Sequence, residues 1–179
     1  MLELLQRRRS IRQYVAGQPV AEETINRLKE TALRVPSSRS LNPWQYIFVS
    51  DQAVLKKLAG CKEHGSGMLA NAALAIVVAA DPEASDVWIE DASIAAWSLQ
   101  VEAEKAGLGT CWVQLRNRKS STDLGSQEYV ADLLDIPENI QLLAIISIGH
   151  PATELPAHPA ESLQWNKIHE GKWQSVSNE

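Results

Sequence analysis

The sequence lacks the features that mark secreted, disulfide-stapled and membrane-spanning proteins. Its 179 residues contain two cysteines, Cys61 and Cys111, without a CxxC pair, which favours reduced structural thiols and a cytoplasmic protein. The longest apolar run, NAALAIVVAA at residues 71–80, is too short to span a membrane and predicts a buried strand. No apolar segment follows the basic residues near the N-terminus, so we expect no secretory signal peptide.

Positive charge is not in excess either. The chain carries 17 lysines and arginines against 22 acidic residues, a net charge of −5, which argues against nucleic acid and membrane surfaces as partners. The hydrophobic fraction of 45% is ample for a packed core and excludes disorder. The length predicts a single domain over residues 1–179, or two copies that share a core across a dimer.

Several well-known functional motifs are missing. The GLG at 107–109 lacks the third glycine of a dinucleotide fingerprint and follows a helix pattern rather than a strand. Ser93 has no GxSxG context, and Cys61 with His64 has no second pair to complete a metal site. Because no acid–base pair or activated nucleophile is evident, any enzyme chemistry must come from a bound cofactor.

Hydrophobic periodicity predicts a mixture of helices and strands, which indicates an α/β or α+β fold with a sheet flanked by helices. The chain from Pro151 has three prolines and no strong period. We therefore predict an extended arm over about residues 151–179 that lies on another surface. Helices are expected within residues 2–11, 19–35, 51–60, 85–107 and 127–135, and strands at 45–50, 74–80, 109–115 and 141–149.

The stretch RRRSIRQY, residues 7–14, places four arginines within six positions. Such close like charges indicate either a solvated helix end or a site for an anion. Because the basic residues are local and the acidic ones diffuse, a compact phosphate is a better partner than a polyanion. Flavin mononucleotide (FMN) suits the pattern: guanidinium forks can hold its phosphate. An arginine beside its N1–O2 edge would stabilise the negative charge that reduction places there.

Four stretches resemble the nitroreductase family in order and spacing. They are RRSIRQY, PSSRSLNPWQYIFV, WIEDASIAAWSLQVEAEKAGLGTCWVQ and LLDIPENIQLLAIISIGHP. The family comprises small FMN-dependent, NAD(P)H-using oxidoreductases, and the chain is most similar to its short-chain branch, from about Leu2 to Pro151. The resemblance implies an α+β fold with a central, mostly antiparallel sheet flanked by helices. It also implies a homodimer that exchanges the C-terminal arm and holds FMN at the subunit interface.

The resemblance further implies which residues hold FMN. Those that match the phosphate, ribityl and N1–O2 segment are Arg8, Arg9, Ser10 and Arg12. Those that match the loop laid against the flavin by the partner subunit are Pro36, Ser37, Ser38, Arg39 and Ser40. Those whose backbone N–H groups are expected to face N5 and O4 are Val113, Gln114 and Leu115.

Three departures from the family pattern bear on the site. Asn42 stands where the family often has glutamine, which keeps an amide on a shorter arm. For a further phosphate contact the arm offers Lys167, His158 or His169, of which we favour Lys167. The insertion that forms a substrate lid in longer members is absent, which predicts an open pocket.

The implied activity is the reduction of nitroaromatic or related electron-poor small molecules with NADH or NADPH, by ping-pong hydride transfer. No catalytic side chain and no metal are expected. The alternatives are a flavin, quinone or enone reductase of the same fold and a flavin-binding sensor without turnover. Trp112 is expected to pack in the core or to wall the pocket, and Trp165 and Trp173 to anchor the arm on the partner subunit.

Overall fold

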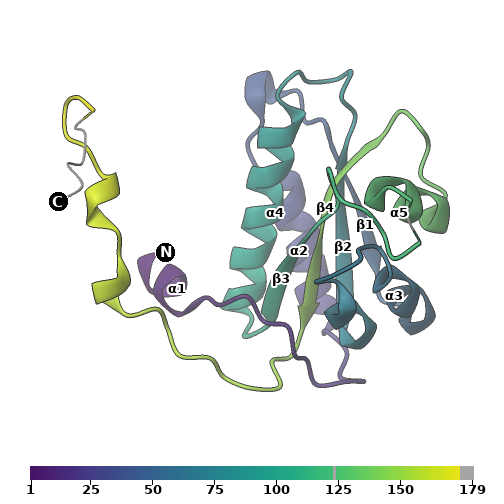
Figure 1. Ribbon diagram of the computed structural model, residues 1–179, viewed down its shortest axis with the longest axis horizontal. Coiled ribbons are helices and arrows are strands. Elements are labelled where there is room, and N and C mark those ends of the chain that lie inside the picture. The colour runs from purple at the N-terminus through teal and green to yellow at the C-terminus, as the bar shows by residue number, and fades with distance from the viewer. Residues whose placement is uncertain (123, 174–179) are drawn as a thin grey trace.

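The computed structural model describes residues 1–122 and 124–173 (Figure 1). Its helices and strands lie where the apolar pattern predicts them. The helices are α1 (Leu2–Arg7), α2 (Glu22–Arg34), α3 (Gln52–Leu58), α4 (Trp88–Lys105) and α5 (Ser126–Leu134). The strands are β1 (Trp44–Val49), β2 (Leu74–Ala80), β3 (Gly109–Gln114) and β4 (Gln141–Gly149). Short 3-10 turns are η1 (Ser38–Ser40), η2 (Gly67–Asn71), η3 (Ala160–Ser162) and η4 (Trp165–Lys167).

The strands form one sheet in the order β1-β2-β4-β3. Every neighbouring pair is antiparallel: β1 with β2, β2 with β4, and β3 with β4. The fold class expected for the chain, a central antiparallel sheet flanked by helices, is therefore confirmed. Within the described residues β1 and β3 are the edge strands, so the segments next to them lie at opposite edges of the sheet.

Helices cover both faces of the sheet, α2 and α4 on one and α3 and α5 on the other (Figure 1). Strand β2 is buried at every residue, and its alternate side chains supply two separate cores. Ile76 and Val78 pack in the cluster that contains Leu99 of α4. Val77 packs on the opposite face in the cluster that contains Leu55 of α3.

Helix α4 is the central helix, as its small residues predict. Ala92, Ala95, Ala96 and Ala103 are completely buried, and their short side chains let the sheet approach the helix closely. The helix contacts β1, β2, β3, β4 and α2. Gly107 follows its end with a φ of +73°, a conformation that favours glycine and stops the helix.

The N-terminal segment crosses the ends of β3 and β4. Ser10 forms a parallel bridge with Thr110, and the N–H of Ile11 donates to the Thr110 carbonyl at 2.8 Å. This close crossing requires glycine on the sheet. A Cβ on Gly109 would lie 2.7 Å from the Ile11 side chain, and one on Gly149 would lie 2.8 Å from the Tyr14 ring.

The chain beyond Pro151 leaves the sheet and runs outward past α1 (Figure 1). Its described part exposes large apolar side chains, including Trp165 at 69% and Trp173 at 82%. The expected arm also covers residues 174–179, which lie outside the described residues. The described arm is extended apart from η3 and η4, as its prolines predict.

Candidate functional site

Three cations from two segments lie within electrostatic reach of Cys111 on β3. Burial raises the pKa of the Cys111 thiol, and Arg12, Lys62 and Arg8 oppose that rise, so all three act on this one position. The Arg8 guanidinium also lies over the Trp97 ring, 5.4 Å from its centroid. We call Arg8, Arg12 and Lys62 the cation cluster. Its members are suited to bind an anion because no carboxylate forms an ion pair with any of them within the described residues.

The neighbouring arginines face elsewhere. Arg7, Arg9 and Ile11 line a separate groove of about 540 Å³ beside the end of α4. Arg7 forms a 3.2 Å ion pair with Glu104, and Arg9 donates to the carbonyl of Pro156 in the arm. The extended backbone alternates its side chains between two sides. Arg8 and Arg12 therefore both act on Cys111, whereas Arg9 contacts the arm.

A buried tyrosine fixes the segment that carries the cation cluster. The Tyr14 hydroxyl lies 2.9 Å from the carbonyl oxygen of Ile11 and 2.8 Å from Ser147 Oγ. The Ser147 hydroxyl in turn donates to the Cys111 carbonyl at 3.2 Å. Burial raises the pKa of Tyr14 above its ordinary value, so the hydroxyl remains a donor. This network ties Ser10–Arg12 to β3 and β4.

Lys62 is a site residue that the sequence did not reveal. It lies in the loop between α3 and η2, far from the arginines in the chain. The loop reaches the region because the N–H of Ser121 donates to the Gly60 carbonyl at 3.1 Å and that of Glu63 to the Lys119 carbonyl at 3.1 Å. A single lysine in CKEHGSG carries no signal of this contact, which only the tertiary fold creates.

The outer edge of β3 starts at the cation cluster and ends at Gln114. The N–H of Leu115 donates to the Leu143 carbonyl at 3.2 Å, so the odd-numbered residues of β3 turn their N–H groups to β4. Antiparallel pairing alternates, and the N–H groups of Trp112 and Gln114 therefore point to the open edge. Val113 and Leu115 are completely buried. Of the three backbone donors expected there, only Gln114 is turned outward, and the sheet occupies the other two.

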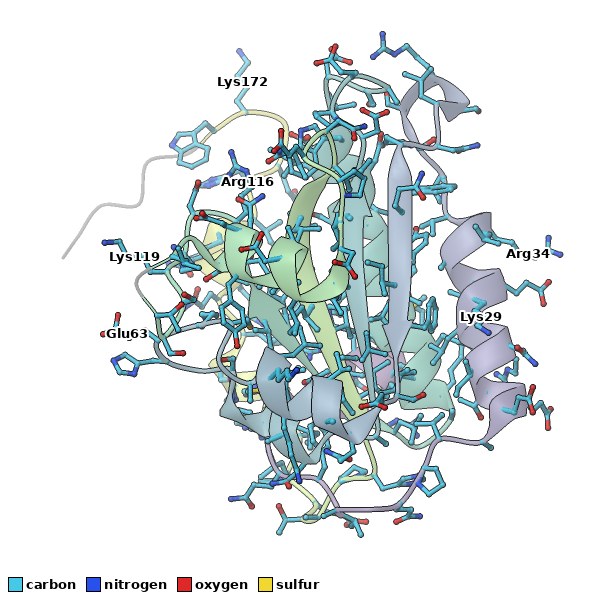
Figure 2. The ribbon with its side chains drawn as sticks, turned by 90° about the vertical axis from the view of Figure 1, so that its right-hand side faces the viewer. Lys29, Arg34, Glu63, Arg116, Lys119 and Lys172 are labelled. Atoms are coloured by element: carbon cyan, nitrogen blue, oxygen red, sulfur yellow. The ribbon has the colours of Figure 1, made fainter. Side chains whose placement is uncertain are left out.

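Side chains near the end of β3 are held in place by one another. Trp112 Nε1 donates to Gln114 Oε1 at 2.8 Å, and Gln114 Nε2 donates to the Arg116 carbonyl at 3.0 Å. Trp112 also packs against the core on the α4 side, which favours its structural role. Figure 2 shows Arg116 and Lys119 on the loop that follows, with Glu63 close to Lys119.

The loop of residues 36–42 is well formed but lies at the opposite corner of the sheet. It precedes β1, whose first residue Trp44 pairs with Ala80, whereas Thr110 pairs with Ile148 at the other end of the other edge strand. Three strand spacings across and about six residues along separate Trp44 and Thr110 by about 25 Å. The middle of the loop therefore lies at the opposite corner of the sheet from Thr110, while Pro36 at its start lines a cavity together with Trp97, the ring that Arg8 covers.

Asn42 and Lys167 take positions that the sequence did not specify. The Asn42 amide oxygen accepts from the Ser37 hydroxyl at 2.7 Å, and its N–H donates to the same hydroxyl oxygen at 2.9 Å. Asn42 thus closes the loop on itself. Lys167 is exposed on η4 in the arm, and within the described residues no hydrogen bond or ion pair joins it to the cation cluster.

The β3 edge suits a ligand that is anionic at one end and carries hydrogen-bonding ring atoms at the other. The cation cluster would hold the anionic end, and the N–H of Gln114 would donate to the ring. Those are the two requirements of FMN. In residues 1–122 and 124–173 no three or more potential metal ligands gather. No helix in the same ranges has the length and hydropathy to cross a membrane.

Comparisons with known proteins agree with this geometry. The model of the nitroreductase family matches residues 5–63 and 60–150. An Archaeoglobus fulgidus protein, provisionally named NADH dehydrogenase/NAD(P)H nitroreductase, is 33% identical over 96% of this chain and 98% of its own length. A solved FMN-dependent nitroreductase from Clostridium difficile superposes with a TM-score of 0.93 at 40% identity, over 97% of this chain and all of that one. A Parabacteroides distasonis structure, also provisionally named NADH dehydrogenase/NAD(P)H nitroreductase, superposes with a TM-score of 0.85 at 31% sequence identity. The match covers 96% of this chain and 98% of that one.

Proposed function

The chain belongs to the nitroreductase family, as an FMN-dependent NAD(P)H oxidoreductase, and we propose that it reduces nitroaromatic or related electron-poor acceptors. The observation that carries the proposal is the cation cluster at one end of an open strand edge with an outward N–H at the other. Bound FMN supplies the transfer of a hydride from NADH or NADPH to the acceptor, in ping-pong order because both substrates use one place.

The protein's own residues bind and orient the cofactor in this proposal. Arg8 and Arg12 hold the phosphate end and the N1–O2 edge, with Lys62 as a third cation. Gln114 donates its backbone N–H to the ring. A fixed positive charge beside the N1–O2 edge stabilises the negative charge of the reduced ring without any reorganisation, as preorganised donors do in an oxyanion hole.

A second copy of the chain completes the site. The resemblance to the family assigns the loop at residues 36–42 to the flavin of the partner subunit, and the strand that follows this loop begins at the opposite corner of the sheet from Thr110 of its own subunit. The exposed apolar side chains of α1, α4 and the arm support this assembly, among them Leu2, Leu5, Ile94, Trp97 and Trp165. Lys167 reaches the phosphate of the partner's flavin in the same arrangement. The two buried free thiols suit a reducing cytoplasm.

An anaerobic titration tests the proposal. The purified protein is loaded with FMN and titrated with NADH and separately with NADPH while the flavin absorbance is followed. We expect bleaching by at least one nucleotide and recovery of the yellow colour on addition of a nitroaromatic. Recovery with quinones or enones alone would assign the alternative acceptors. A yellow protein that neither nucleotide bleaches would be a flavin sensor and not an enzyme.

A further inference from the structure

The loop between α2 and β1 has an unusual backbone. Arg39, Ser40 and Asn42 have φ values of +53°, +56° and +49°. They are three of the five non-glycine residues with positive φ in the described ranges. Side chains other than glycine avoid this region because the Cβ crowds the backbone. A segment with three such residues keeps its shape only if surrounding contacts impose it.

A buried carboxylate on α4 supplies the main contact. Asp91 is 3% exposed, and its Oδ1 accepts from the N–H of Ser38 at 2.8 Å. Its Oδ2 accepts from the Ser85 hydroxyl at 3.2 Å. No ion pair in the described residues includes Asp91. Its charge is stabilised by neutral donors and by its place in the first turn of α4, where the helix dipole favours an anion.

The other contacts of the loop do not attach it firmly to the core. Ser37 and Asn42 bond to each other, which closes the loop but does not attach it. The ion pair of Arg39 with Asp86 is exposed, with side chains 63% and 76% accessible, so water and salt weaken it. Asp91 is thus the link between the closed loop and a rigid helix.

We propose that Asp91 is a positioning residue: it holds the loop of residues 37–42 in the shape that meets the flavin of the partner subunit. The proposal rests on the proposed function, because it takes the flavin as the loop's target. Asp91 itself touches no cofactor in this assignment and acts through Ser38. Its loss should therefore weaken flavin binding in the partner's site and leave the cation cluster of its own subunit intact.

The first test compares Asp91→Asn with a matched control. Asn is isosteric and removes the charge that binds the Ser38 N–H, so we expect FMN affinity about 10-fold weaker by equilibrium dialysis. Glu90→Gln removes the same charge from the same turn of α4 at an exposed position and should bind FMN as the wild type does. Thermal unfolding shows that both are folded. Ser85→Ala keeps the Asp91 carboxylate but removes one of its hydrogen bonds, so it should lower FMN affinity by a smaller factor. This variant replaces Asp91→Asn in the test if Asp91→Asn fails to fold.

The second test asks where the defect acts. Dimers are assembled from one Asp91→Asn subunit and one Arg12→Gln subunit, with different affinity tags. If the loop acts across the interface, both defects fall in one site, and the other site binds FMN with wild-type affinity. If each subunit uses its own loop, each site carries one defect and no wild-type site appears, which overturns the proposal.

The outcomes separate the two proposals. Wild-type protein that binds no FMN overturns the proposed function, and this inference with it. Wild-type and Asp91→Asn proteins with equal FMN affinity overturn the inference alone. Weak binding by Asp91→Asn homodimers together with one restored site in the mixed dimers supports it.

Discussion

The arginines near the N-terminus have different partners according to their position in the chain. Arg7 is neutralised by Glu104, and Arg9 holds the arm through the Pro156 carbonyl. Arg8 and Arg12 act at Cys111 together with Lys62. The charge that the sequence concentrates in one stretch is therefore divided by the fold, and only part of it is available to a ligand on the β3 edge.

The first prediction concerns Arg12. Replacing it with glutamine should weaken FMN binding by about 10- to 100-fold, because a hydrogen bond to a charged group contributes about 1.5–3 kcal/mol. Arg8→Gln should act in the same direction, and Arg9→Gln much less. Equilibrium dialysis measures all three. Arg34→Gln is the control, since Arg34 projects from α2 (Figure 2) and forms an ion pair with Glu30 on the same helix. Wild-type affinity in both Arg8→Gln and Arg12→Gln would refute the site.

The second prediction concerns Cys61. Burial raises the pKa of its thiol to about 11, whereas an unfolded thiol titrates near pH 8.5. Above about pH 8.5 the unfolded chain loses a proton that the folded chain keeps. Stability should therefore fall as pH rises toward 11, by up to about 1.4 kcal/mol per pH unit.

Urea unfolding of wild type and Cys61→Ala between pH 7 and pH 10 checks this dependence. The variant should be less stable at pH 7 because it leaves a small cavity, and the gap should narrow at pH 10. Parallel stability curves over the whole range would show that the thiol does not titrate as expected.

At the scale of elements, the site depends on an irregular segment pressed against a sheet edge. Ile11 and Tyr14 pack directly on Gly109 and Gly149, and Ser10 and Ile11 continue the sheet beyond β3 for one bridge. The rest of that edge keeps its outward N–H groups for a ligand. Glycine is required here for the close approach and not for an unusual φ.

The third prediction follows from that contact. In Gly109→Ala the new Cβ would lie 2.7 Å from Ile11, so the segment that carries Arg8 and Arg12 must move away from β3. We expect a stability loss of about 1–3 kcal/mol and a marked loss of FMN affinity, measured by urea unfolding and dialysis. Gly67→Ala, where a Cβ meets nothing within 4 Å, should change neither. Normal FMN affinity in Gly109→Ala would mean that the segment's position is unimportant.

The sequence predicts the elements well and the site only in part. Periodicity locates β2, which is buried at every residue, and α4, whose small residues are buried along one broad face. The arginine stretch indicates Arg8 and Arg12 as candidates, and in the structure both act on Cys111. The sequence could not reveal Lys62 or Asp91, because the roles proposed for them depend on contacts between segments distant in the chain. The sequence also could not show that the Leu115 N–H donates to β4, because strand register is a tertiary property.

At the scale of the whole molecule, the proposed site needs a second subunit. Its loop and its cation cluster lie at diagonal corners of the sheet, and its arm extends into solvent with Leu163, Trp165 and Ile168 more than half exposed. Isolated proteins rarely leave contiguous apolar surface of this kind uncovered. A two-fold partner would cover the arm and bring each loop to the opposite cation cluster at once.

The final prediction is that the arm controls both assembly and cofactor binding. A chain that ends at Ala152 keeps the contact of the Ala152 N–H with the Gln13 carbonyl at 3.0 Å, so its sheet and both cores should remain folded by circular dichroism. It lacks Trp165, Trp173 and Lys167, and it should sediment as a monomer at concentrations where we expect the full chain to be a dimer. Its FMN affinity should fall steeply and depend on protein concentration, because each site needs a second subunit. Leu124→Ser, which alters an apolar side chain 40% exposed outside the arm, should leave sedimentation and FMN binding unchanged. A truncated chain that stays dimeric and binds FMN normally would show that the arm is dispensable to the site.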